Sequence, residues 1–136
     1  MPTPTLDLIR GVPLFSGLDD RLLQRLAGEF FEKTFSDGEV IAAEGEAGRT
    51  FIVIDAGEVS VSVQGKEVTK LGPGQSFGEM ALIDKAARSA TVKAVGPAHC
   101  YMLPIWSFRP IVEEHPEMAW SLLESLAKLV RDTQAR

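Results

Sequence analysis

The sequence predicts a mainly β domain, an antiparallel β-roll or jelly roll with flanking helices at both ends. Short stretches rich in β-branched residues are separated by glycines at intervals of about 8–12 residues, as in small antiparallel rolls. Helical spacing of apolar residues dominates residues 5–33 and 105–136. The chain has 136 residues, enough for one core and too few for two ordinary domains. We therefore expect a single domain over residues 1–136, with the β-roll at residues 34–104.

The first helices are expected to form a collar that packs on the roll. Residues 6–9 predict one helical turn, which Gly11 and Pro13 end. A longer helix then begins at either Ser16 or Asp19, since both side chains can cap a helix N-terminus. Its apolar residues recur at helical spacing: Leu22, Leu23, Leu26, Ala27 and Phe30.

Strand periodicity replaces helical periodicity after this collar. Val59, Val61 and Val63 alternate with polar residues, which predicts a strand with one buried face. Gln64-Gly65 follows as a tight hairpin turn, because glycine tolerates the positive φ that such turns need. The expected strands cover residues 40–42, 50–55, 58–63, 67–71, 91–94 and 99–103.

Two helices are expected after the strands. Pro104 ends the last strand, and a short helix follows over residues 107–114. His115-Pro116 interrupts it, and Pro116 begins a helix of about 18 residues, since proline is favoured in a first helical turn. One stripe of this helix holds Met118, Leu122, Leu126, Leu129 and Thr133.

Composition and charge argue against several classes of protein. The formal net charge is −5, so no broad basic face is expected and nucleic acid is not an expected partner. No apolar run approaches about 18 residues and no signal peptide pattern opens the chain, so no membrane span is expected. The single cysteine, Cys100, fits a cytoplasmic protein. His99 and His115 lack metal-ligand spacing and form no recognisable catalytic triad, so we expect neither a metal site nor an enzyme.

The most informative stretch is residues 77–83, Phe-Gly-Glu-Met-Ala-Leu-Ile, followed by residues 88–92, Arg-Ser-Ala-Thr-Val. Gly78 allows a tight turn before a short apolar helix, whose free backbone N–H groups favour a phosphate. Arg88 adds a guanidinium that can pair with phosphate oxygens. Glu79 can accept hydrogen bonds from a ribose hydroxyl, and a phosphate held beside a sugar hydroxyl describes a cyclic nucleotide. An internal ion pair between Glu79 and Arg88 is the alternative explanation.

This stretch resembles the phosphate-binding cassette of cyclic nucleotide-binding domains, a family that includes modules of the bacterial catabolite activator protein, kinase regulatory subunits and cyclic-nucleotide-gated channels. The resemblance rests on Phe77-Gly78-Glu79-Met80-Ala81-Leu82 and on Arg88-Ser89-Ala90-Thr91, which begins nine residues after Glu79. A motif of this length and spacing is far more specific than a single glycine-rich turn. The resemblance implies the β-roll fold and a receptor whose ligand is cAMP or cGMP, with no other cofactor.

The resemblance also implies roles for the cassette residues. Arg88 would bind the exocyclic phosphate, and Glu79 would bind the ribose 2′-hydroxyl. Ser89 and Ala90 would give the phosphate a hydroxyl and backbone N–H groups. The remaining cassette contacts would come from the backbone of Gly78, Met80 and Ala81.

The base contacts implied by the resemblance come from outside the cassette. An apolar wall would be formed by Val61, Val68 and Leu71, although a strand buried without a ligand gives the same pattern. The final helix would supply a lid, with Leu129 and Thr133 at the contact. Related channels and the bacterial activator carry an arginine where Leu129 aligns, so an apolar lid is expected here. Helix packing or a homodimer seam is the alternative for both positions.

The expected function is that of a non-enzymatic receptor whose C-terminal helices relay ligand occupancy to a downstream protein partner or to a parent effector domain. The serine after Arg88 can reach a guanine amino group but also serves the phosphate in bacterial cAMP binders, so cAMP is favoured and cGMP stays open. A β-roll interaction module without ligand binding is one alternative, against which Glu79, Arg88 and Ser89 argue. A cupin-like metalloenzyme is the other, and two separated histidines do not support it.

Overall fold

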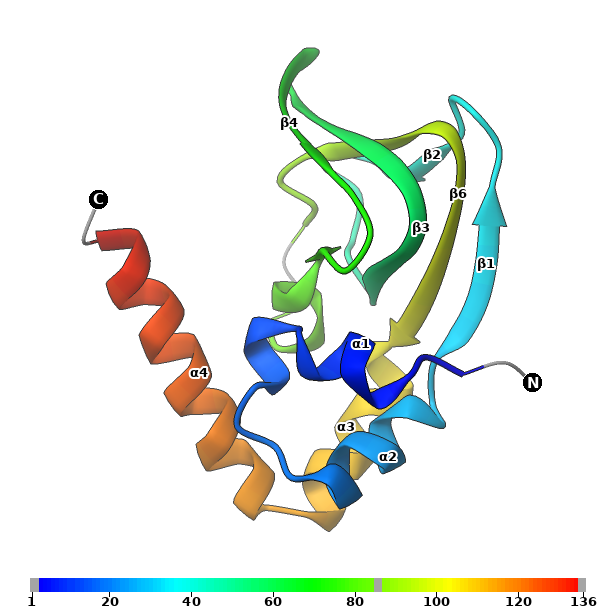
Figure 1. The fold of residues 1–136 in the computed structure, drawn as a ribbon. Coiled ribbons are helices and arrows are strands. Elements are labelled where there is room, and N and C mark those ends of the chain that lie inside the picture. Colours follow the sequence, from blue (N-terminus) through cyan, green and yellow to red (C-terminus); the bar gives the residue numbers. More distant parts are fainter. Residues whose placement is uncertain (1–2, 85–86, 135–136) are drawn as a thin grey trace.

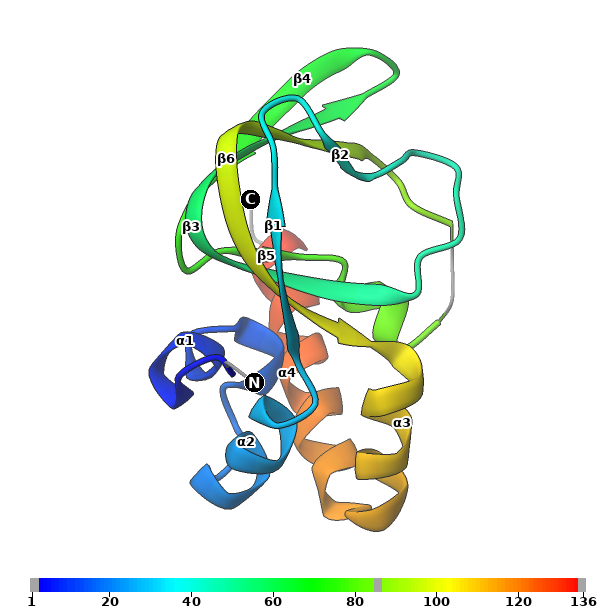
Figure 2. The ribbon, with the colours of Figure 1, turned by 90° about the vertical axis from the view of Figure 1, so that its right-hand side faces the viewer.

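The computed structural model describes residues 3–84 and 87–134 and confirms the predicted antiparallel roll with flanking helices. The strands curl into the roll, and the helices gather at one end of it (Figure 1). In the view turned by 90°, α1, α2 and α3 again lie below the strands (Figure 2). The helices are α1 (Leu6–Arg10), η1 (Pro13–Phe15), α2 (Asp20–Ala27), η2 (Glu79–Leu82), α3 (Ile105–Glu114) and α4 (Glu117–Gln134). The strands are β1 (Phe31–Phe35), β2 (Val40–Ala42), β3 (Thr50–Val63), β4 (Lys66–Leu71), β5 (Ser76–Phe77) and β6 (Thr91–Pro104).

The first two α-helices begin at capping side chains. Thr5 accepts a hydrogen bond from the N–H of Leu8 at 3.1 Å, and Asp19 accepts one from the N–H of Leu22 at 2.9 Å. Of the two cap residues considered for α2, Asp19 is therefore the one used. The cap satisfies a backbone N–H that has no partner within the helix.

Strand β1 begins at Phe31, inside the stretch expected to be helical up to residue 33. Helix α2 ends at Ala27 with Gly28 as its cap residue, and β1 then pairs antiparallel with β6 along its whole length. The boundary was misplaced because Phe30 continues the apolar spacing of α2. Phe30 is buried, but it follows the end of the helix and precedes the strand.

Four of the short strands expected from the sequence are joined in the structure into two long strands. β3 joins residues 50–55 to 58–63, and β6 joins residues 91–94 to 99–103. Irregularities in the β3–β6 register on both sides of Ala56 bend the strands without ending them. Gly57, at φ 93°, approaches β6 so closely that an added Cβ would lie 2.8 Å from the Cα of Ala98. This glycine permits a close crossing of two backbones where the sequence predicted a break.

The hairpin between β3 and β4 has the predicted turn. Gln64 and Gly65 adopt φ values of 52° and 82°, the left-handed pair that a two-residue hairpin turn needs. The register slips within the hairpin: Val61 faces Thr69, whereas the next residue of β3 faces Glu67. Val68 is therefore the extra residue of a bulge and has no partner across the hairpin.

Two apolar clusters lie on opposite faces of β3 and β6. Phe51 and Val53 join one face to the helices, where the ring of Phe15 meets that of Phe51 edge-on at 5.6 Å. The alternate residues Ile52 and Ile54 belong to the second cluster, inside the roll. Residues 51–54 are consequently buried on both faces, so β3 anchors the helices and the roll together.

The C-terminal helices follow the expected order. Helix α3 begins at Ile105, two residues earlier than expected, because its first apolar residue is buried against the body of the domain. Helix α4 packs through Met118 and Leu122 onto the first apolar cluster, and its second half rises from the helical end to the level of the strands (Figure 1). Among the helices in the described part of the chain, none has the length and apolar character that crossing a membrane requires.

Candidate ligand-binding site

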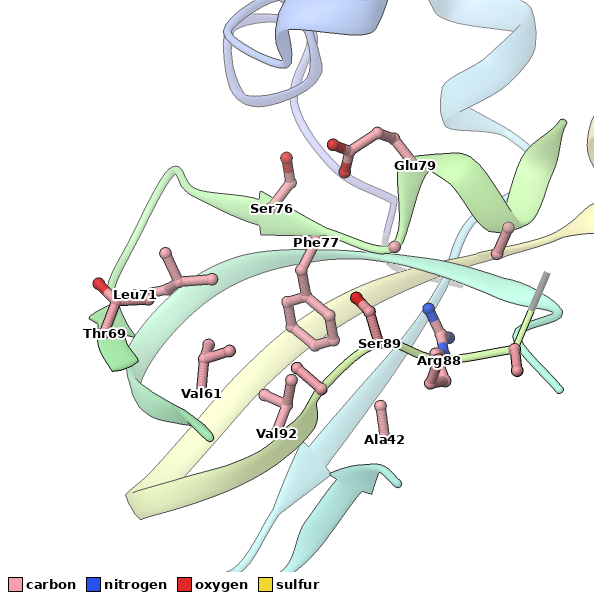
Figure 3. Close-up of a pocket in the computed structure, with 14 residues that line it drawn as sticks. Ala42, Val61, Thr69, Leu71, Ser76, Phe77, Glu79, Arg88, Ser89 and Val92 are labelled. Atoms are coloured by element: carbon pink, nitrogen blue, oxygen red, sulfur yellow. The ribbon is translucent and has the colours of Figure 1, made fainter. Parts of the chain in front are cut away.

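A cavity of about 320 Å³ opens in the side of the roll, between the β3–β4 hairpin and the segment that follows η2. Figure 3 shows its two ends, with Arg88 at one and Leu71 and Thr69 at the other. The lining residues are Ala42, Val61, Thr69, Leu71, Ser76, Phe77, Gly78, Glu79, Ala81, Ala87, Arg88, Ser89, Ala90 and Val92. Eight of the twelve residues expected at the site are in this set: Val61, Leu71, Gly78, Glu79, Ala81, Arg88, Ser89 and Ala90.

Arg88 is a half-buried cation that lacks an acidic partner among the described residues. Its Nη2 donates a hydrogen bond to the carbonyl oxygen of Thr50 at 2.7 Å. Burial lowers the pKa of its guanidinium from the ordinary value, and no neighbouring carboxylate raises it. Because arginine keeps its charge at neutral pH, a cation is presented to the cavity with an incomplete set of partners.

Small residues form a slot around the Arg88 side chain. A Cβ added to Gly48 would lie 3.2 Å from its Cδ and Nε, and a Cβ added to Gly78 would meet its Nη1. Gly78 also has a φ of 85°, so both its conformation and its surroundings favour glycine. The slot leaves the guanidinium few alternative positions.

The backbone of Arg88 is held as firmly as its side chain. Its N–H donates to the carbonyl of Glu46 at 2.7 Å, and its carbonyl accepts from the N–H of Gly45 at 2.9 Å. Ala47 and Ala87 form a bridge between the same two segments. The loop before β3 therefore fixes the segment that carries the cation.

Glu79 lines the edge of the cavity, but its carboxylate points away from Arg88. Figure 3 shows Glu79 and Ser76 directed to one side of β5, while Phe77 is directed to the other. In the part of the chain that the structure describes, Glu79 and Arg88 form no ion pair, so the internal salt bridge considered from the sequence is absent. The carboxylate would have to turn in order to share a ligand with Arg88.

The opposite end of the cavity is apolar, and one expected residue is missing from it. Val61 and Leu71 line it as expected, together with Thr69. Val68 is 60% exposed and is not among the residues that line the cavity, unlike the other two residues of the expected wall. The cause is the bulge at Val68, which brings Thr69 opposite Val61 on the inner face.

Neither of the expected lid residues lines the cavity. Leu129 lines a separate space of about 100 Å³ with Pro13, Ser76 and Glu79. Thr133 is exposed, and its hydroxyl donates to the carbonyl of Leu129 within α4 at 2.9 Å. In this structure α4 packs along η1 and does not cover the cavity, so a lid formed by α4 stays a prediction for the ligand-bound form.

Several lining residues were not expected from the sequence. Thr69 and Ser76 add hydroxyl groups, and Ala42, Phe77 and Val92 add apolar surface. The sequence could not identify Thr69 as a lining residue, because the alternation of residue types does not reveal the bulge that turns it inward. Phe77 and Val92 lie in or directly beside the cassette, so the sequence could have indicated that they line the cavity. The side chain of Met80 lies outside what the structure describes, and its backbone belongs to η2.

The arrangement can bind a small anion that also has an apolar part. A cation and two neighbouring hydroxyl or backbone groups lie at one end, and aliphatic side chains lie at the other. Figure 3 shows the Ser89 hydroxyl and the Arg88 guanidinium directed to the same side of their segment. Among the described residues, no group of three or more His, Cys, Asp or Glu side chains could hold a metal ion.

The roll, its helices and this polarised cavity define a class of small-molecule binding domain. The family model described as the cyclic nucleotide-binding domain matches residues 32–115. The chain belongs to the cyclic nucleotide-binding domain family.

Relatives and solved structures agree with this assignment. The chain is 33% identical over 117 residues to the cAMP-dependent protein kinase regulatory subunit of Yarrowia lipolytica, covering 86% of this chain and 31% of that protein. It is 32% identical over 111 residues to the human potassium/sodium hyperpolarization-activated cyclic nucleotide-gated channel 4, covering 82% of this chain and 9% of the channel. The chain thus spans less than a third of the length of these curated relatives.

Two solved structures share the fold. The N-terminal domain of a transcriptional regulator from Streptomyces coelicolor A3(2) has a TM-score of 0.86 at 28% identity, covering 95% of this chain and 94% of that one. The Thermus thermophilus catabolite activator protein has a TM-score of 0.74 at 27% identity, covering 90% of this chain and 60% of that one. Both confirm the predicted β-roll with its helices.

Proposed function

We propose that this domain is a non-enzymatic cytoplasmic receptor for a cyclic nucleotide, with cAMP favoured over cGMP. The observation that carries the proposal is Arg88, a half-buried cation that faces the cavity and whose side chain, among the described residues, pairs with one carbonyl oxygen. A phosphate would supply the anionic oxygens that this guanidinium lacks. An interaction module with no ligand would gain nothing from an unpaired cation in this position.

The polarity of the cavity supports one orientation of a bound cyclic nucleotide. In the proposed complex the phosphate would lie at Arg88, beside the Ser89 hydroxyl and the backbone at Ala90, all of which line the cavity. The purine would lie against Val61 and Leu71, which line the apolar end. The Thr69 hydroxyl donates to the carbonyl of Lys70 at 3.3 Å, so it can accept a hydrogen bond from the edge of the base.

Binding would change the position of Glu79 and of α4. Glu79 points away from Arg88, and Leu129 of α4 shares a small space with it. When the carboxylate turns toward a ribose hydroxyl, the shape of the space between Glu79 and α4 changes. The ligand therefore favours a form in which α4 is repositioned, and α4 relays occupancy to a downstream partner or a parent effector.

Isothermal titration of the nucleotide-stripped protein with cAMP, and separately with cGMP, tests the proposed function. Saturable binding of one nucleotide per chain is expected, with the smaller Kd for cAMP. AMP serves as the control, because it carries the same base without the cyclic phosphate. Absence of binding by both cyclic nucleotides at millimolar concentration would contradict the proposal and favour the interaction module.

Exposed apolar residues on the outer face of α4 favour self-association, which is one way in which α4 would transmit ligand occupancy. Trp120, Leu123 and Val130 are 71%, 53% and 51% exposed, and the exposed Ala127 lies between them. Their spacing of three and four residues is the spacing of a coiled-coil seam. We therefore propose a homodimer through α4.

Replacing Leu123 by glutamate is expected to weaken this dimer at least several-fold, because it places a charge in the apolar seam. Sedimentation equilibrium measures the dissociation constant. Val95→Glu is the matched control, since Val95 is an exposed apolar residue of β6, 41% exposed and outside α4. A wild-type protein that sediments as a monomer at every concentration would exclude the homodimer.

A further inference from the structure

A histidine on the outer face of the roll connects three strands. His99 of β6 has its Nδ1 3.0 Å from Oδ2 of Asp55 on β3, and its Nε2 2.7 Å from Oε2 of Glu32 on β1. The His99 side chain is 26% exposed, and the two carboxylates are 43% and 39% exposed. The cluster is formed by residues outside the cavity described above.

Local backbone structure brings the two carboxylates to this ring. Glu32 is opposite Tyr101 in the β1–β6 register, and Tyr101 shares a face with His99 because the two are separated by one residue. Asp55 lies at the irregularity between Ile54 and Ala56, where β3 has one residue more than β6. A bulge of this kind redirects a side chain, and here it turns Asp55 toward His99.

The two contacts cannot both persist with a neutral imidazole. A neutral ring carries one N–H and one lone pair, so one of the two carboxylates would face a nitrogen lone pair. The imidazolium has an N–H on each nitrogen and can donate to Glu32 and Asp55 together. We propose that His99 is a proton-binding clamp, which in its charged form holds β1 and β3 to β6 and makes the stability of the domain depend on pH.

The surroundings of the ring support this assignment. Glu32 faces it from β1, Asp55 faces it from β3, and the phenol ring of Tyr101 meets it edge-on with centroids 5.2 Å apart. The hydrogen bond to Glu32 raises the pKa of His99, burial opposes it, and Asp55 raises the pKa further. Burial also raises the pKa of Tyr101, so the phenol is uncharged at neutral pH.

The same geometry argues against a metal site. The two carboxylates contact different nitrogens, which lie on different edges of the imidazole ring. A metal ion can take only one of these nitrogens together with a carboxylate. A proton on each nitrogen satisfies both contacts.

The sign of the pH dependence follows from the raised pKa. The unfolded chain releases its histidine proton near pH 6.5, and the folded chain holds it to higher pH. The clamp therefore stabilises the fold fully below about pH 6.5 and loses this contribution as the pH rises through the folded pKa of His99. Carboxylates are ionised above about pH 5.5, which sets the lower end of a useful experiment.

NMR titration in a His115→Gln background, where His99 is the only histidine left, tests the clamp directly. The expected pKa of His99 is above about 6.5, and it falls in the Glu32→Gln/Asp55→Asn variant. Thermal unfolding supplies the second readout. At pH 6 the Tm of the wild type is expected to exceed that of His99→Gln by about 2–6 °C, and the difference disappears near pH 9.

Each readout can overturn the proposal. A His99 pKa at or below 6.5, or one that is unchanged by neutralising both carboxylates, contradicts a shared proton. A Tm difference that is the same at pH 6 and pH 9 indicates a purely structural histidine. If His99→Gln does not fold, the Glu32→Gln/Asp55→Asn variant provides the same pH comparison with the ring retained.

Discussion

Replacing Arg88 by leucine is expected to lower the affinity for cAMP by tenfold to more than a hundredfold. The guanidinium is the cation at the phosphate end of the cavity, and its contacts with the described residues include no carboxylate. A charge-assisted bond to a phosphate contributes about 1.5–3 kcal/mol, and each 1.4 kcal/mol corresponds to about a factor of ten in Kd. Isothermal titration of both proteins measures the ratio.

The matched control is Thr133→Ala. This hydroxyl bonds the carbonyl of Leu129 inside α4 and does not line the cavity, so the change should alter affinity by less than about fivefold. Equal losses in the two variants would show that Arg88 has no special role. Such a result would also mean that α4 closes over the ligand far enough for Thr133 to contact it.

The ligand-free stability of Arg88→Leu separates binding from folding. The variant loses the bond to the Thr50 carbonyl but also removes a half-buried charge, so its free energy of unfolding should change by no more than about 1 kcal/mol. A much larger loss would mean that Arg88 mainly supports the fold. Urea unfolding of the stripped proteins makes the comparison.

The cassette could be predicted from the sequence because its parts are close along the chain. Gly78, Glu79 and Arg88 lie within one turn-helix-strand segment, so spacing alone brings them to one side of the roll. The Gln64-Gly65 turn was predictable for the same reason, since two consecutive residues determine it. Local sequence therefore predicted which cassette residues lie together at the cavity.

The remaining features depend on contacts between distant segments. A bulge moved Val68 out of the apolar wall and placed Thr69 in it, and alternation of residue types cannot reveal a single inserted residue. The position of Leu129 depends on how α4 packs on η1, which is a tertiary choice. His99 was assigned no role from its sequence spacing, because Glu32 and Asp55 reach it only through strand pairing.

Gly78→Ala is expected to lower cAMP affinity about tenfold, the second largest effect, with a modest cost in stability. An added Cβ would meet Nη1 of Arg88 and lie 3.0 Å from the carbonyl oxygen of Thr50. The guanidinium must then leave its position against that carbonyl, so its alignment with the phosphate is lost, at about 1.4 kcal/mol for a tenfold change in Kd. The positive φ adds about 1–2 kcal/mol of backbone strain in any non-glycine residue.

Gly74→Ala isolates the effect of this close approach. Gly74 has the same φ as Gly78, 85°, and an added Cβ there would meet nothing within 4 Å. Both variants carry the same backbone strain, and Gly78→Ala should lose about 1 kcal/mol more in urea unfolding, since it also displaces Arg88 from the Thr50 carbonyl. Only Gly78→Ala should lose cAMP affinity in isothermal titration. Equal affinities in the two variants would mean that Arg88 can reach the phosphate from another position. In that case the slot between Gly48 and Gly78 would not be what orients the guanidinium.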